Sequence, residues 1–230
     1  MNKVIKSNIS IKNLTGEKIS EHKTNQKTKI LVWLDFGPYA YFNFGIISAL
    51  SKLDEFEFIG ITTIKKDYIF FQNQKLIQFK KLLYYPDCYI NKSSYDLKKL
   101  KKYETQYDLN LWLDIFGERS FYKYWIDFYK FTKNEILSIV EHSITFFIDI
   151  LDTFKPDLVL MQQPGENISN LLLYRIANKT GINTITPNLL YLHDKILISN
   201  NIDNKEISDE FKNLINNTNN SSEIYDENYL

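Results

Sequence analysis

The sequence is short of cysteine, of net charge and of long apolar segments. Its single cysteine, Cys88, forms no internal disulfide and has no second cysteine for a thiolate metal site. Three histidines at no recognised ligand spacing add no metal centre, so we predict none. Lysine plus arginine equal aspartate plus glutamate at 28 each, so no net field favours nucleic acid or an anionic membrane. Nucleic-acid binding is therefore not expected.

Apolar runs of the kind that direct export or membrane insertion are also missing. The first 29 residues lack the continuous apolar stretch of a secretory signal. Residues 136 to 154 form the most apolar long segment, but Glu141, His142, Asp149 and Asp152 interrupt it. We predict no transmembrane segment and a cytoplasmic location, which suits a chain with one free thiol.

Three motifs that carry common chemistries are absent. Neither GxGxxG nor GxxxxGK[ST] occurs after a predicted strand, so a standard dinucleotide site or P-loop is not predicted. No GxSxG elbow occurs, and no Ser/His/Asp or Cys/His arrangement can be assembled. Hydride transfer, phosphoryl transfer and serine hydrolysis are therefore disfavoured.

Alternating strand-like and helix-like segments are present, and they predict the fold. Apolar runs predict strands at residues 29–36, 57–64, 81–90, 157–162, 182–186 and 195–199. Helical spacing fills residues 42–53, 67–79, 93–102, 132–154 and 170–180. Strands separated by helices indicate parallel pairing, hence a doubly wound, mostly parallel Rossmann-like α/β sheet covered on both faces. We predict one such domain over residues 29–200, with polar tails or linkers at 1–28 and 201–230.

Several local signals refine these elements. Thr132 and Glu135 form a capping box before the long helix, and Gly181 closes the last helix in the left-handed region. Pro86 is predicted to interrupt its strand or confine it to an edge, and Pro187 to end the following strand. Residues 93–131 form an inserted, aromatic-rich helical region, with Gly117 between two helices. Its aromatic residues at helical spacing are interpreted as core in preference to carbohydrate platforms.

Two loops follow buried strands, where ligands bind in open α/β sheets. They span residues 35–39 and 162–169. The predicted substrate-binding residues in these loops are Gly37, Pro38, Tyr39, Gly165, Asn167 and Ser169. Glycines let a ligand approach the backbone, Tyr39 offers a ring, and amide groups at the second helix start favour an anion or a hydroxyl. The alternative is ordinary turn and cap chemistry without a ligand.

Catalytic candidates are few. Glu166 is a carboxylate on a strand-end loop, and His193 follows the strand that Pro187 ends, so each is a candidate base. The alternatives are a solvated acid near a helix N-terminus and a structural histidine. The pair Glu118–Arg119 is interpreted as a surface pair.

Residues 155 to 200 resemble the closing part of the N-terminal Rossmann-like domain of GT-B glycosyltransferases. The similarity lies in the order of Lys155-Pro156-Asp157-Leu158-Val159, a loop, a small helix, Gly181-Ile182-Asn183 and the strand-like residues 195–199. Among such proteins, the surface and capsule polysaccharide biosynthesis proteins are the most similar. The resemblance implies an acceptor-side domain that binds a carbohydrate acceptor but no cofactor of its own. A second Rossmann-like domain or chain would bind the nucleotide-sugar donor, and the sequence ends before one.

Two functions follow from this resemblance. The first is the acceptor side of a GT-B-like glycosyltransferase in capsule-like polysaccharide synthesis, with Glu166 or His193 as base. The second is a non-catalytic α/β module that binds carbohydrate or protein. A flavodoxin-like or receiver-like domain fits less well, because the helical insertion and the late strands exceed those compact folds.

Overall fold

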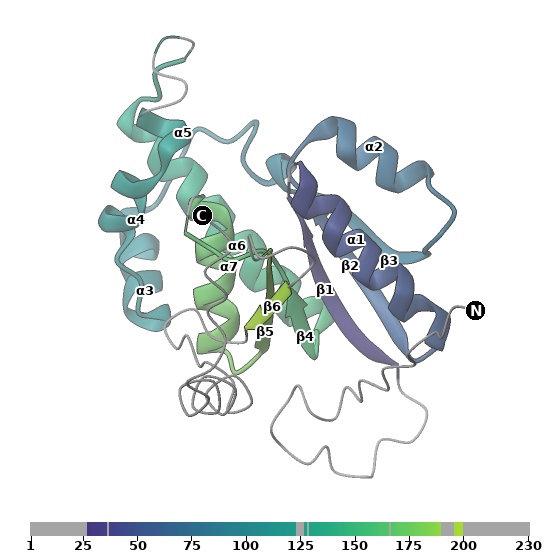
Figure 1. Cartoon of the computed structure of the whole chain (residues 1–230). Helices are drawn as coiled ribbons and strands as arrows, with labels where there is room; N and C mark the ends of the chain where they lie inside the picture. Colours follow the sequence, from purple (N-terminus) through teal and green to yellow (C-terminus); the bar gives the residue numbers. More distant parts are fainter. Residues whose placement is uncertain are drawn as a thin grey trace, which may run out of the picture.

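The computed structural model describes residues 27–199 except 36, 123–126, 128, 166 and 190–195, and it shows a six-stranded sheet (Figure 1). The strands are β1 (Thr28–Leu34), β2 (Phe56–Thr62), β3 (Phe79–Tyr84), β4 (Leu158–Leu160), β5 (Asn183–Leu189) and β6 (Ile196–Ser199). Their order is β3-β2-β1-β4-β5-β6, and every pairing is parallel except β5 with β6. The predicted doubly wound, mostly parallel α/β sheet is confirmed.

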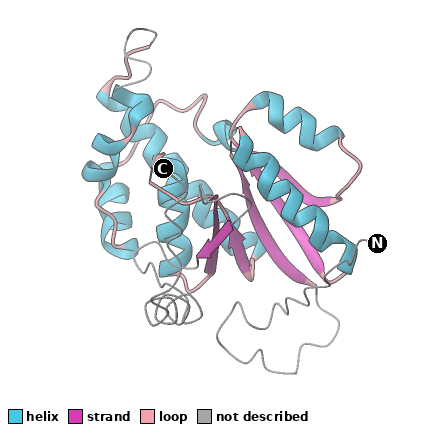
Figure 2. Ribbon diagram, viewed as in Figure 1, coloured by secondary structure: helices cyan, strands magenta, loops and turns pink. Residues whose placement is uncertain are grey.

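Helices cover both faces of the sheet (Figure 2). One layer holds α1 (Pro38–Leu50) and α2 (Lys65–Asn73), and the other holds α6 (Lys133–Phe154) and α7 (Ile168–Lys179). Outside α6 and α7 lie α3 (Leu97–Tyr107), α4 (Leu111–Gly117) and α5 (Arg119–Tyr122). Side chains of β1 alternate between the layers, because successive residues of a strand point to opposite faces. Val32 packs in the cluster with α1, and Trp33 in the cluster with α6 and α7.

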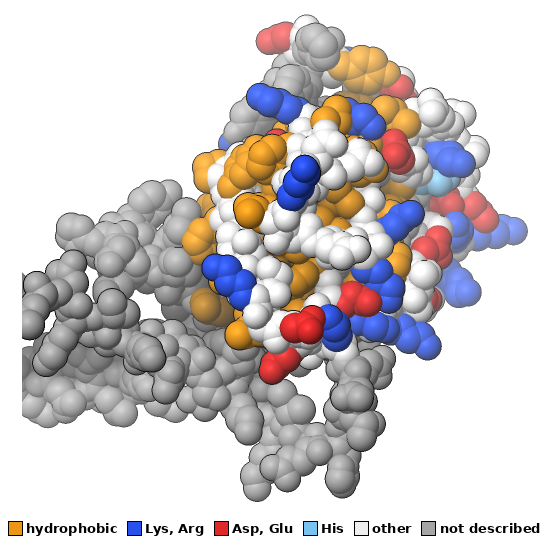
Figure 3. Space-filling model, turned by 90° about the vertical axis from the view of Figure 1, so that its right-hand side faces the viewer, with side chains coloured by type: hydrophobic (Ala, Val, Ile, Leu, Met, Phe, Trp, Pro, Cys, Tyr) orange, Lys and Arg blue, Asp and Glu red, His pale blue; other side chains and the backbone are white. Residues whose placement is uncertain are grey.

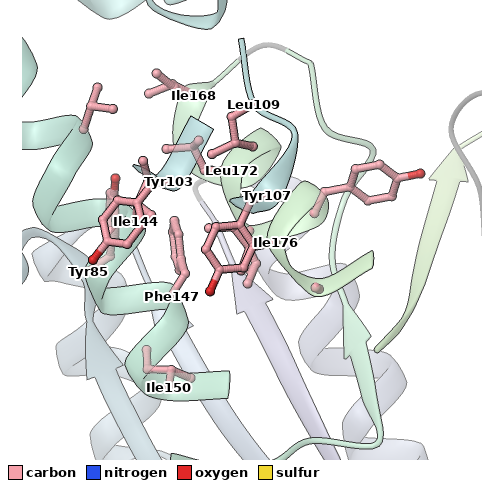
Figure 4. Close-up of a cluster of buried hydrophobic side chains, with 14 of the residues drawn as sticks. Tyr85, Tyr103, Tyr107, Leu109, Ile144, Phe147, Ile150, Ile168, Leu172 and Ile176 are labelled. Carbon is pink, nitrogen blue, oxygen red and sulfur yellow. The ribbon is translucent and has the colours of Figure 1, made fainter. Parts of the chain in front are cut away.

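The larger core lies between the sheet and α6 and α7 (Figure 4). Tyr85 follows β3 in a short 3-10 helix (Tyr85–Cys88) and stacks on Phe147 of α6, with ring centroids 5.6 Å apart. Its hydroxyl lies 2.6 Å from that of Ser143, so the one polar atom of this buried ring is satisfied. The capping box that opens α6 is present, with Glu135 N–H donating to Thr132 and Thr132 N–H to Glu135. That prediction is confirmed.

Several predicted element boundaries are wrong. Residues 67–79 do not form one helix, because α2 ends at Asn73 and Phe79 already begins β3. The Gln74 side chain makes this turn: its amide donates to the carbonyl of Ile77, and its oxygen accepts from Ile77 N–H. The strand predicted at residues 81–90 ends at Tyr84, and Pro86 lies beyond it in the 3-10 helix, where a missing N–H costs little. Because β3 stops before Pro86 and stands at the edge of the sheet, the prediction that this proline interrupts its strand or confines it to an edge is confirmed.

Pro187 lies inside β5 and does not end it. Residues 183–185 of β5 pair with β4, and residues 186–189 pair with β6. Pro187 stands opposite Ile198 in this second pairing. A proline is tolerated where one side of a strand has no neighbour to receive its N–H. Gly181, with φ of 79°, supplies the left-handed residue expected after α7. No helix within the described ranges is both long enough and apolar enough to cross a bilayer.

Candidate functional site

A buried carboxylate marks the carboxyl end of β1. Asp35 follows this strand directly and is 2% exposed. Its Oδ1 accepts a hydrogen bond of 2.9 Å from the hydroxyl of Thr63, which follows β2. Its Oδ2 accepts from the amides of Gln162, at 2.5 Å, and of Asn167, at 3.5 Å. Asp35 therefore joins the ends of β1, β2 and β4 to the start of α7.

This polar group lies where the winding of the sheet reverses. β1 stands between β2 and β4, and the helices that follow β1 and β4 pack on opposite faces of the sheet. The two connections therefore separate at the carboxyl edge, and in this class of fold ligands usually bind in the crevice between two such connections. The two loops predicted to bind substrate, residues 35–39 and 162–169, meet here through the Asp35 hydrogen bonds.

Each of the two loops carries one glycine in a backbone conformation that favours glycine. Gly37 has φ of 67° and is the N-cap of α1, with Pro38 in its first turn. Gly165 has φ of 145°. A Cβ added to either would meet no heavy atom within 4 Å, so open space adjoins both loops. A ligand can approach the backbone at these two positions.

Aromatic side chains stand beside the first loop. Tyr39, in the first turn of α1, is 41% exposed. Tyr41 donates a hydrogen bond of 3.3 Å to Asp67 of α2 and packs edge-on against Phe70, with centroids 5.5 Å apart. Burial, and secondarily the Asp67 carboxylate, raise the pKa of Tyr41. Figure 3 shows hydrophobic side chains gathered over the part of this face where α1 and α2 lie.

The start of α7 already has a carboxylate of this chain. Glu118, between α4 and α5, is 4% exposed and accepts a hydrogen bond of 2.5 Å from Ile168 N–H. Its other oxygen accepts from Ser120 N–H and hydroxyl. The interpretation of Glu118–Arg119 as a surface pair is therefore wrong for Glu118, which is buried. Its carboxylate accepts from a free N–H at the start of α7, where we expected an anion or a hydroxyl of a ligand to bind.

Buried polar atoms without a partner among the described residues flank the second loop. Gln162 is 9% exposed, and its Oε1 is unpartnered although its amide nitrogen binds Asp35. Asn170, in the first turn of α7, is 0% exposed and has neither Oδ1 nor Nδ2 paired. Such atoms are rare in native proteins, and each calls for an explanation such as a water or a ligand.

The predicted site residues fall into two groups. Gly37, Pro38, Tyr39, Gly165, Asn167 and Ser169 lie on the two loops that meet at the crevice or in the first turn of α7. Asn167 is the N-cap of α7, but its side chain makes no cap hydrogen bond. Glu166 and His193, the two proposed bases, lie outside the described residues.

Sequence reasoning missed the polar centre of the crevice. Asp35 and Gln162 lay inside the predicted loops but were not among the proposed site residues, and Thr63 lay inside a predicted strand. A signal existed, because each is a polar residue at the end of a buried apolar strand. The interpretation of the aromatic-rich helices as core is also wrong in part. Phe121 is buried, but Phe116 of α4 is 67% exposed and packs against Trp112 and Tyr122 on the surface.

Comparisons with known proteins add little to this geometry. A scan against models of protein families finds no match, and a search of curated proteins finds none either. Among solved structures, the chain is similar to the UDP-GlcNAc 2-epimerase from Methanocaldococcus jannaschii, at 18% sequence identity and a TM-score of 0.38. The similarity covers 68% of this chain and 30% of the epimerase, so the chain spans less than a third of that protein's length. The assignment to the Rossmann-like α/β class therefore rests on this chain's own strand order and register.

Proposed function

We propose that this chain binds a carbohydrate in the crevice between β1 and β4, as the acceptor-side part of a GT-B-like glycosyltransferase. The observation that carries the proposal is the convergence of residues 35–39 and 162–169 on Asp35. The two loops carry two glycines beside open space, two carboxamides and an exposed tyrosine. This combination suits a hydroxyl-rich ligand. Few, well-placed polar groups next to an aromatic surface are typical of small-molecule sites.

Each group has a role in this proposal. Asp35 is a positioning residue that orients the amides of Gln162 and Asn167. The two amides and the loop backbone bind sugar hydroxyls, and Tyr39 packs against the sugar ring. Glu166 or His193 takes the proton from the attacking hydroxyl. The nucleotide-sugar donor binds to a second Rossmann-like domain or chain, and the process served is capsule-like polysaccharide synthesis in the cytoplasm.

Saturation-transfer NMR with neutral mono- and oligosaccharides tests the binding step. We expect signal transfer to at least one sugar with the unmodified chain, and loss of that transfer with Asp35→Asn, which keeps the side-chain shape. Asp54→Asn is the matched control, because Asp54 is exposed and pairs with Lys27. Equal transfer in all three proteins would place sugar binding elsewhere, and no transfer to any sugar would contradict the proposal.

A second candidate is carbohydrate binding without turnover. In this candidate the hydrogen-bonded group of Asp35, Gln162 and Asn167 binds and orients a sugar, and no proton transfer takes place. Incubating the chain with labelled nucleotide sugars and a bound acceptor separates the two. Label transfer that is lost in Glu166→Ala or His193→Ala supports the transferase. Saturable binding with no transfer, also after addition of a donor-binding partner domain, supports the binding module.

A further inference from the structure

The surface formed by α1, α2 and β3 exposes large apolar side chains. Four of them lie in or beside α2 and are between 42% and 71% exposed: Ile64, Ile69, Phe70 and Leu76. The exposed ring of Tyr41 packs against Phe70 and connects them to α1, which has no charged residue along its length. Neighbouring exposed apolar side chains of this number usually mark a contact with another molecule.

The charges of the same surface are almost all positive. Residues 58–86 contain one acid, Asp67, which is buried, and five lysines, all of them exposed: Lys65, Lys66, Lys75, Lys80 and Lys81. The acids that flank this stretch are Glu57, which pairs with Lys80 at 2.7 Å, and Asp87. Lys and Arg side chains lie among and around the hydrophobic side chains of this face in Figure 3. The whole chain has no net charge, but this surface is basic.

A pocket of about 520 Å³ opens in this surface between α2 and β3. Three of the five lysines line it: Lys75, Lys80 and Lys81. The apolar part of its lining includes Phe71, Ile77 and Phe79. Ammonium groups beside apolar side chains suit a molecule that joins a phosphate to a hydrocarbon, as the headgroup end of an anionic lipid does.

The residue types favour a bilayer over a second protein. Lysine is depleted in protein–protein interfaces, where arginine is enriched, and residues 58–86 contain five lysines and no arginine. At a membrane surface, lysine stems lie along apolar groups while the ammonium groups reach lipid phosphates. The zero net charge of the chain does not oppose this contact, because charges beyond a Debye length of about 10 Å at 0.1 M salt are screened.

We propose that the surface formed by α1, α2 and β3 docks onto an anionic lipid bilayer. Ile64, Ile69, Phe70 and Leu76 enter the headgroup region, and the lysines bind lipid phosphates. The chain lies on the bilayer without crossing it. This docking is independent of the proposed sugar binding, which needs no bilayer, so either can fail without the other.

Sedimentation of the full chain with lipid vesicles tests the docking. One set of vesicles is phosphatidylcholine alone, and the other contains about one third phosphatidylglycerol. We expect binding to the anionic vesicles to be about tenfold tighter or more at about 0.1 M salt, and to weaken at about 1 M salt, where the Debye length is about 3 Å. Equal binding to the two sets, or no binding to either, would overturn the proposal.

Charge variants locate the docking surface. Lys66→Gln, Lys75→Gln and Lys81→Gln are combined in one chain. The matched control combines the same change at three exposed lysines of α3: Lys98→Gln, Lys101→Gln and Lys102→Gln. Because both chains lose the same net charge, we expect about a tenfold loss of anionic-vesicle affinity in the first and less than about twofold in the control. Equal losses would show attraction by net charge alone and would contradict docking through α2 and β3.

A fluorescent label measures insertion of the apolar side chains. An environment-sensitive dye is attached to Ile69→Cys or, as the control, to Leu97→Cys at an exposed position of α3. Cys88 should react little with the dye, because burial raises the pKa of its thiol to about 12. We expect anionic vesicles to shift the emission to the blue only for the label at position 69. A shift at position 97 alone, or at neither position, would rule out this orientation.

The apolar variants also identify the competing occupant, a second copy of this chain. Ile69→Asn combined with Leu76→Asn changes two exposed side chains, so we expect an unchanged Tm and about a tenfold loss of vesicle affinity. Analytical ultracentrifugation of the free chain and of this variant follows self-association. A dimer that the two substitutions abolish while vesicle binding persists would assign the surface to a second copy and would refute bilayer docking.

Discussion

The side-chain amide of Gln162 donates a hydrogen bond of 2.5 Å to Asp35, a residue 127 positions earlier in the chain. The bond joins the carboxyl ends of the two central strands, β1 and β4, at the point where the connecting helices separate to opposite faces. Asn167 reaches the same carboxylate from the start of α7. This group of Asp35, Gln162 and Asn167 therefore forms only when β1 and β4 have paired in the sheet.

The Asp35–Gln162 pair should be energetically coupled. We expect Asp35→Ala and Gln162→Ala to show a coupling free energy of about 1–2 kcal/mol in a double-mutant cycle, because both groups are buried and one is charged. Urea unfolding of the four proteins, followed by far-UV circular dichroism, measures it.

Lys80 and Glu57, an exposed pair 2.7 Å apart, provide the control cycle, for which we expect less than about 0.5 kcal/mol. Equal coupling in the two cycles would show that the Asp35 contact does not hold the strand ends together.

Glu118 should stabilise the start of α7. Glu118→Ala removes the acceptor for Ile168 N–H and for Ser120, so we expect a loss of about 1–3 kcal/mol in the free energy of unfolding. Glu118→Gln keeps an acceptor oxygen and should lose less. Chemical denaturation with tryptophan fluorescence compares the two variants, and an alanine variant as stable as the native chain would contradict the buried cap.

Local sequence patterns predicted most elements of the fold but not the polar centre of the site. The KILVWL run predicted β1, and the capping box with helical apolar spacing predicted α6, because both signals lie within a few residues. The turn that Gln74 makes and the place of Pro187 in β5 depend on side-chain hydrogen bonding and on which strands are neighbours. Sequence spacing carries neither kind of information.

The polar group around Asp35 was harder to predict than the elements of the fold, because its residues are distant from one another in the sequence. Asp35, Thr63 and Gln162 each follow a buried strand, yet their convergence requires the order in which the strands pair. The rule that ligands bind at the carboxyl ends of parallel strands located the two loops, but not the residues that meet between them. Helical spacing likewise placed Phe116 and Trp112 in a periodic pattern, but it did not show that these two side chains lie on the surface, 67% and 47% exposed.

Gly60, in the middle of β2, should tolerate no branched side chain. A Cβ there would lie 2.7 Å from a methyl group of Leu82 and 3.3 Å from one of Leu34. We expect Gly60→Val to lower the free energy of unfolding by about 1–3 kcal/mol through overpacking. Gly45 of α1 has no atom within 4 Å of its added Cβ, so Gly45→Ala should instead stabilise the helix by up to about 1 kcal/mol. Urea titration of both variants measures these opposite signs.

Stability should fall in alkaline solution because acidic groups around the 3-10 helix Tyr85–Cys88 are buried or half-buried. Burial raises the pKa of Cys88 from 9.0 to about 12, that of Tyr89 from 10.0 to about 12, and that of Tyr85 well above 10.0. Between its unfolded and folded pKa, each group binds more protons in the folded state. Its stabilising contribution is therefore full below the unfolded pKa and is lost as the pH rises from about 9 toward 12.

Urea unfolding at pH values from 8 to 11 measures this loss. Tyr85→Phe removes one of the three groups and should flatten the decline with pH, although it loses the Ser143 hydrogen bond at neutral pH. Tyr39→Phe, at an exposed position, is the control and should leave the decline unchanged. A stability that is constant across this range would contradict the buried placement of these side chains.

The most direct test of the account maps a bound sugar onto the chain. Backbone amide shifts are followed by nitrogen-15 NMR while the neutral sugar that binds best is added to the full chain. We predict saturable shifts confined mainly to residues 35–39, to Thr63 and to residues 162–169, and their loss in Asp35→Asn. Shifts centred instead on α4 and α5, or no saturable shifts at all, would contradict a ligand crevice between β1 and β4.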